Sequence, residues 1–84
     1  MKAYYVTFRS VTYAQRGQAR LTAAGVNTTL RRTPKWMENQ GCGYCLRVPR
    51  AWGTEAVRIL RTDGIAFRKI YRENEDGTMD EVQL

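Results

Sequence analysis

The stretch Ala3-Tyr4-Tyr5-Val6-Thr7-Phe8 decides the fold, because aromatic and β-branched residues alternate along it. Tyr4, Val6 and Phe8 lie on one face of the strand that this pattern predicts, and Tyr5 and Thr7 lie on the other. The stretch follows Met1 and Lys2 directly, with no apolar leader and cleavage site before it. We therefore expect a strand over residues 3–8, in a cytoplasmic protein.

Outward from this strand, the pattern changes between helical and strand spacing four more times. Helices are predicted over about residues 12–24 and 51–63, and strands over about 26–32, 44–48 and 66–71. Ser10 or Thr12 supplies an N-cap for the first helix, and Gly25 and Gly64 end the two helices. The order β-α-β-β-α-β predicts an α+β fold, a ferredoxin-like sandwich with a four-stranded antiparallel sheet and two helices on one face.

Two residues within the predicted helices carry specific expectations about packing. Gly17 is unfavourable inside a helix, and its lack of a side chain is expected to allow close contact with the sheet. Trp52 shares helical spacing with Ala56 and Ile59, which predicts that the indole is part of the core.

The 84 residues are enough for one domain, which we place at residues 1–72, followed by an acidic and mobile tail over 73–84. All fourteen Lys and Arg lie within residues 1–72, where only three acids, Glu38, Glu55 and Asp63, oppose them. A body so basic is typical of proteins that bind nucleic acid or an acidic partner, or that stabilise an anion such as a thiolate. A solvated basic surface without a partner is the simpler alternative.

The segment with the most reactive chemistry is residues 40–47, QGCGYCLR, in which Gly41 and Gly43 flank Cys42. Glycines on both sides allow the backbone to approach a ligand closely, so we expect the Cys42 sulfur to be exposed on a loop. Nearby cations are expected to lower the pKa of this thiol from about 8.5 toward neutrality, or to dock an acidic partner. These cations are Arg31, Arg32, Lys35, Arg47 and Arg50.

A Cys42 thiolate would accept sulfur or selenium and pass it on, and Cys45 would resolve the intermediate as an internal disulfide. The alternation of residues 44–48 predicts that Cys45 faces away from Leu46 and Val48. Trp36 and Tyr44 are candidates to cover the thiol pocket, although a tryptophan in this position more often closes the edge of the core. We expect no cofactor other than a transient persulfide or perselenide on Cys42.

Several short motifs of the sequence, the Cys42-Gly43 pair among them, are spread over about residues 3–72. Together they resemble a family of small bacterial proteins described as Se/S carrier protein-like. In that family the Cys-Gly pair is the distinctive motif, which corresponds to Cys42 and Gly43 here. Residues 38–41 replace a serine-rich run, and Cys45 falls where the family need not have a cysteine. The resemblance implies a sulfur or selenium carrier whose partners are a cysteine desulfurase or proteins of selenium metabolism. It rests on residues 4–8 with Ser10, 24–26, 33–34, 42–43 followed by 46–48, and 63–65.

Three other interpretations of the two cysteines stay open. Both thiols could be buried and inert, as free cysteines often are. The CxxC spacing is also half of a zinc site, but the chain has no histidine and no second CxxC, so the site would have to be shared across a dimer. In thioredoxin-type redox proteins the CxxC begins a helix, whereas Cys42 and Cys45 lead into a predicted strand.

Single-stranded RNA binding is the main alternative from another class, because a ferredoxin-like sheet with a basic body is the architecture of RRM domains. The expected K/R-G-F/Y-G/A-F-V-x-F/Y signature is absent, and Tyr5 is the one aromatic residue of residues 3–8 predicted to face outward on the sheet. Acid–base catalysis has little support without histidine, so we expect a thiol carrier rather than an enzyme. The open sheet face also offers a surface for a homodimer, and no stretch is long and apolar enough to predict a membrane helix.

Overall fold

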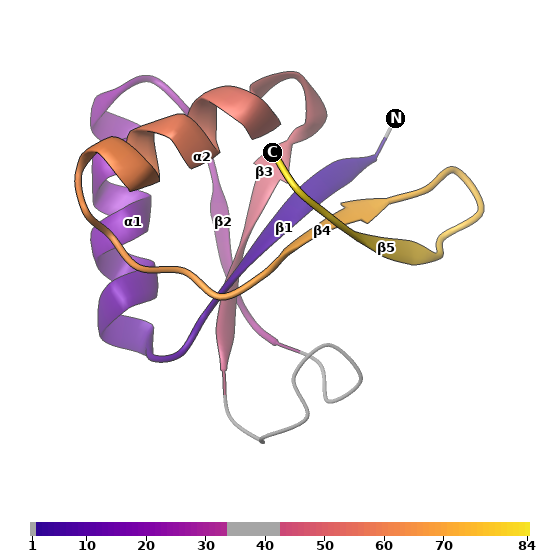
Figure 1. Ribbon diagram of the computed structural model, residues 1–84, viewed down its shortest axis with the longest axis horizontal. Coiled ribbons are helices and arrows are strands. Elements are labelled where there is room, and N and C mark those ends of the chain that lie inside the picture. The colour runs from indigo at the N-terminus through magenta and orange to yellow at the C-terminus, as the bar shows by residue number, and fades with distance from the viewer. Residues whose placement is uncertain (1, 34–42) are drawn as a thin grey trace.

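The computed structural model describes residues 2–33 and 43–84, which form an α+β fold of two helices and a five-stranded antiparallel sheet (Figure 1). The helices are α1 (Val11–Ala23) and α2 (Gly53–Thr62), and a 3₁₀ turn (Arg50–Trp52) directly precedes α2. The strands are β1 (Ala3–Phe8), β2 (Thr29–Arg32), β3 (Tyr44–Pro49), β4 (Ile70–Glu73) and β5 (Met79–Val82).

Strand β1 lies at the centre of the sheet, whose order is β2-β3-β1-β4-β5. It pairs with β3 on one side, where Phe8 lies opposite Tyr44, and with β4 on the other, where Tyr5 lies opposite Tyr71. Strand β3 therefore separates β1 from β2, although β1 and β2 are joined through α1. The strand predicted over residues 3–8 is confirmed, and its alternation divides the sheet into two faces.

The face of the sheet that packs against the helices carries the main core. Val6 and Phe8 of β1 join Leu46 and Val48 of β3, all with at most 1% of their surface exposed. The helices contribute buried residues to the same cluster, among them Leu21 of α1 and Leu60 of α2. Both helices thus cover one face, as the sequence predicts, and the ribbon shows them on the same side of the strands (Figure 1).

Helix α1 begins and ends as its cap residues predict. The Ser10 hydroxyl accepts a hydrogen bond from the backbone N–H of Tyr13 at 3.4 Å, and Gly25 adopts a φ of 85° after the last turn. Gly17 is buried, and a side chain there would lie 3.1 Å from Leu60 and 3.2 Å from Phe8. Its predicted role in close packing is confirmed.

The prediction that Trp52 belongs to the core is wrong, since 45% of the residue is exposed. The 3₁₀ turn ends at Trp52 and α2 begins one residue later, which turns the indole outward. Gly53 is buried in its place, and a Cβ at that position would lie only 2.3 Å from Cδ2 of Tyr4. The tyrosine ring thus occupies the space that a larger residue at 53 would need.

The expectation of four strands is also wrong, because residues 79–82 form β5 and pair with β4. A tight turn at Asp76 and Gly77 makes this hairpin possible: Gly77 has a φ of 89°, and the backbone N–H of Thr78 donates to Oδ1 of Asp76. Met79 and Val82 are half-buried, so residues 73–84 have more apolar contact than their five acids imply. The ferredoxin-like assignment stays a prediction, since that arrangement has four strands.

We expect Gly53→Ala to destabilise the fold by roughly 1–3 kcal/mol, because the added methyl group overlaps the Tyr4 ring. Alanine is otherwise favoured over glycine in a helix by about 1 kcal/mol, so a stabilised variant would contradict this packing. Chemical denaturation measures the difference. Thr54→Ala, at an exposed position of the same helix, is the control, and in a Tyr4→Ala background the cost of Gly53→Ala is expected to shrink.

Candidate functional site

The pairing of β2 with β3 places the two ends of the segment that holds Cys42, residues 34–43, which we call the cysteine loop. The backbone N–H of Thr33 donates to the carbonyl of Gly43 at 2.9 Å, one step beyond the pair Arg32 and Tyr44. The residues on either side of positions 34–42 therefore lie side by side at one end of the sheet (Figure 1). Four of the predicted site residues, Lys35, Trp36, Gly41 and Cys42, lie outside the described residues.

Cys45 lies on the sheet face opposite the helices, where it is a free thiol with 1% of its surface exposed. It lies opposite Thr7 of β1 and Arg31 of β2, and it packs in a small cluster with Ala3 and Tyr5. Leu46 and Val48 belong instead to the main core. The predicted orientation of Cys45, away from those two residues, is confirmed.

The surroundings of Cys45 favour the protonated thiol. Burial raises the pKa of Cys45, because removing the sulfur from water disfavours the thiolate. Thr33 and the positive charge of Arg31 lower the pKa, but by less than burial raises it. At neutral pH Cys45 is therefore a thiol rather than a nucleophilic thiolate.

Thr33 lies beside Cys45, a contact that the sequence did not predict. It is 6% exposed, and its hydroxyl has no hydrogen-bond partner of regular geometry, although it is near enough to affect the Cys45 thiol. Threonine before proline is a common way to end a strand, so its sequence context carries no functional signal. Only the register of β2 against β3 places it beside Cys45.

The predicted cations divide between the two ends of β3. Arg31 faces Cys45, and the Arg32 guanidinium carbon lies 5.8 Å from the centre of the Tyr44 ring, so both lie toward the base of the loop. Arg47 is half-buried opposite Tyr5, in the middle of the strand. Arg50 follows the other end of β3 and is exposed there. The structure thus brings Arg32 to Tyr44 and Arg31 to Cys45, on opposite faces of the sheet, and does not bring Arg50 to either.

The described part of the chain contains neither a group of potential metal ligands nor a membrane-spanning helix. Within residues 2–33 and 43–84, no three of the residues Cys, Asp and Glu gather as potential metal ligands. The same residues include no helix that is long and apolar enough to span a bilayer.

The chain belongs to the protein family whose model is described as "Putative Se/S carrier protein-like", which matches residues 3–72. The resemblance noted from the Cys-Gly motif is thereby confirmed, and the matched range includes both cysteines. Comparisons with curated proteins and with solved structures find no match.

The burial of Cys45 predicts slow modification in the folded protein. In a Cys42→Ser variant, where Cys45 is the one remaining thiol, we expect iodoacetamide to label the native chain at least about a hundredfold more slowly than the chain unfolded in urea. Mass spectrometry of timed samples measures both rates. Equal rates in the two states would show that the sulfur is accessible, contrary to its position in the cluster with Ala3 and Tyr5.

Proposed function

We propose that this protein is a cytoplasmic sulfur or selenium carrier in which Cys42 accepts the chalcogen. The observation that supports this assignment most is the contrast with Cys45, which is sealed against Ala3 and Tyr5 and has a raised pKa. The family match covers both cysteines, so a carrier that works through a thiol has Cys42 as its remaining nucleophile.

The proposed transfer is a sequence of two exchange reactions that need no outside oxidant. The Cys42 thiolate attacks the terminal sulfur of a persulfide on a donor protein, a new S–S bond forms, and the donor leaves as a thiolate. An acceptor nucleophile then attacks the same terminal sulfur and releases the Cys42 thiolate. A perselenide passes through the same steps with selenium as the transferred atom. The persulfide is transient, and no resident cofactor takes part.

The residues around the loop are proposed to stabilise the anion and shape its site. Gly41 and Gly43 give the backbone its freedom, and Arg31 and Arg32 supply positive charge at the loop base. Tyr44, held by Arg32, is proposed with Trp36 to cover the carried atom. Lys35, Arg47 and Arg50 remain proposed contacts for the anion or for an acidic partner.

Cys45 is proposed as a resolving thiol that acts only when the sheet face opens. Its sulfur is buried in the folded chain, so forming an internal disulfide with Cys42 requires β3 or its neighbours to move first. Resolution would expel the carried chalcogen as hydrosulfide or hydroselenide, and the cysteine pair would then need reduction by another thiol. This requirement makes Cys45 a secondary participant rather than the acceptor.

The proposed donors are a cysteine desulfurase or proteins of selenium metabolism, since these present a persulfide or an activated selenium. A homodimer through the sheet face opposite the helices also remains a prediction. Neither partner changes the chemistry at Cys42.

Transfer from a cysteine desulfurase tests the acceptor directly. After incubation with the desulfurase and cysteine, the native chain is expected to gain the mass of one sulfur atom, and peptide mapping is expected to place it on Cys42. Cys45→Ser is the matched control, because it removes the other thiol and leaves the predicted acceptor in place. Its gain should equal that of the native chain.

The variant Cys42→Ser is expected to gain no sulfur under the same conditions. A Cys42→Ser chain that is loaded as readily as the native one would remove Cys42 from the proposed role. Circular dichroism of both variants is the control for the native fold, and a variant that keeps the native spectrum but fails to load has lost the reactive thiol.

A further inference from the structure

A groove with an excess of positive charge follows the segment that joins α2 to β4, first beside α1 and then between α2 and β5, on a part of the molecule that the proposed carrier function does not use. Its floor is the segment of residues 63–70, which leads from α2 into β4, and three hollows of about 430, 240 and 180 Å³ follow one another along it. The second and third share Phe67 and Arg68, and the first ends at Ile65, next to Ala66 of the second. We call this surface the basic groove.

The charge of the basic groove is strongly unbalanced. Two acids line it, Asp63 and Glu81, and each is already paired: Asp63 with Arg20 at 2.6 Å and Glu81 with Lys69 at 3.7 Å. Four further arginines line the same hollows, and no other acidic side chain does so among the described residues. These arginines are Arg9, Arg16, Arg61 and Arg68. One of the four, Arg61, donates to the backbone oxygen of Leu84 at 2.6 Å, so the positive charge considered below is that of Arg9 and Arg16. Such an excess along a groove attracts an extended polyanion.

Aromatic rings are interleaved with these cations. Tyr13 is 39% exposed, and the guanidinium carbon of Arg16 lies 6.0 Å from the centre of its ring. Phe67 is half-buried, and the guanidinium carbon of Arg61 lies 5.6 Å from the centre of the Phe67 ring. Both rings line the 240 Å³ hollow, together with Arg9. Rings and guanidinium planes side by side are the surfaces on which unpaired bases stack.

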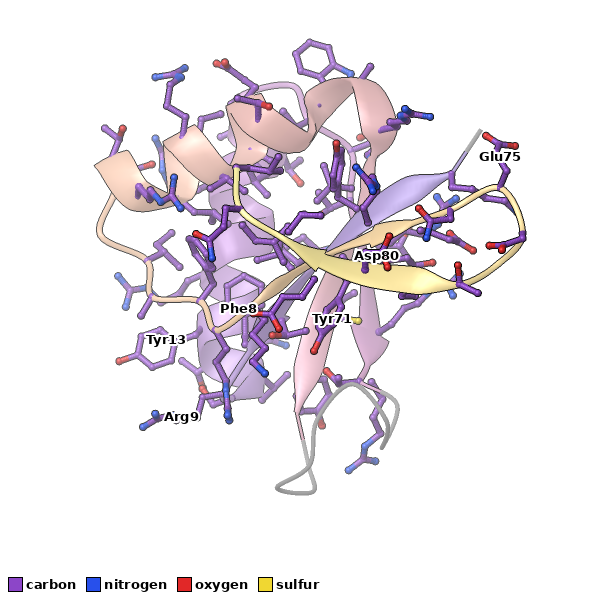
Figure 2. All side chains as sticks on the ribbon, turned by 45° about the vertical axis from the view of Figure 1, so that its right-hand side comes forward. Phe8, Arg9, Tyr13, Tyr71, Glu75 and Asp80 are labelled. Carbon is purple, nitrogen blue, oxygen red and sulfur yellow. The ribbon has the colours of Figure 1, made fainter. Side chains whose placement is uncertain are left out.

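The position of the groove separates it from the acidic end of the molecule. Figure 2 shows Arg9 and Tyr13 projecting together on one side, whereas Glu75 and Asp80 lie along the hairpin on the other. Arg9 directly follows Phe8, which lies opposite Tyr44, so the groove starts at the end of the sheet from which the cysteine loop departs. The opposite sheet face is a poorer platform, because Tyr5 there is only 7% exposed.

We infer that the basic groove binds a single-stranded nucleic acid, with phosphates held by Arg9 and Arg16 and a base stacked on Tyr13. An acidic protein would use the charges but would leave the exposed Tyr13 ring and the adjoining hollow without a role. The phosphates of a duplex could also bind the arginines, but its bases are already stacked on one another and cannot stack on the Tyr13 ring. This inference does not depend on the chemistry of Cys42.

Fluorescence anisotropy with labelled oligo(U) and oligo(dT) of about twelve nucleotides tests the inference, over a range of about 50 to 200 mM salt. We expect the protein to bind one or both oligonucleotides, with an affinity that falls as the salt concentration rises. The double variant Arg9→Gln/Arg16→Gln should bind at least about tenfold more weakly at low salt, and its salt slope should fall by about 1.4. Tyr13→Ala should bind the oligonucleotide about fivefold to a hundredfold more weakly, and Tyr13→Phe should bind it like the native chain.

The matched control is Arg58→Gln/Arg72→Gln, which removes two charges that line none of the three hollows and should change binding by less than twofold. Four results would overturn the inference: no binding at low salt, equal loss in the control, no effect of Tyr13→Ala, or preference for a duplex of the same sequence. Competition by polyglutamate as effective as that by the oligonucleotide would also overturn it, in favour of an acidic protein partner.

Discussion

The register of β1 between β3 and β4 is the constraint on which the rest of the structure depends. With Phe8 opposite Tyr44 and Val6 opposite Ile70, every second residue of β1 is directed to the helices. The residues between them, including Thr7, lie on the other face. The Thr7 hydroxyl adds two hydrogen bonds beside β4, because it donates to the carbonyl of Lys69 and accepts from the backbone N–H of the same residue. A shift of one residue would exchange the two faces along the whole strand.

The same register determines the surroundings of Cys45. Because Thr7 lies opposite Cys45, the sulfur of Cys45 is held against Ala3 and Tyr5 rather than in water. Two positions earlier, at Gly43, the pairing of β2 with β3 ends with the hydrogen bond from the backbone N–H of Thr33 to the carbonyl of Gly43. Two thiols that look equivalent in the motif CGYC are therefore unequal: one is a packing residue within a strand, and the other precedes the strand.

Much of the fold follows from local patterns, and the errors arise where contacts between distant segments decide. The alternation in residues 3–8, the cap at Ser10 and the glycines that end both helices were sufficient to predict those elements, because each depends on neighbouring residues. Trp52 was misjudged because helical spacing cannot show that the Tyr4 ring fills the position beside Gly53. The strand β5 was missed because its stability comes from pairing with β4 and from a turn at Gly77, and its acidic composition hides both.

We propose that Cys42, and not Cys45, carries the reactive sulfur. The rate of alkylation measured against pH in the two single-cysteine variants tests this claim most directly, because the thiolate is the reacting form. We expect that Cys42, observed in Cys45→Ser, reaches half of its maximal rate below about pH 8.5, and that Cys45, observed in Cys42→Ser, does so above that value. A Cys42 that titrates at or above the pH of Cys45 would contradict the account.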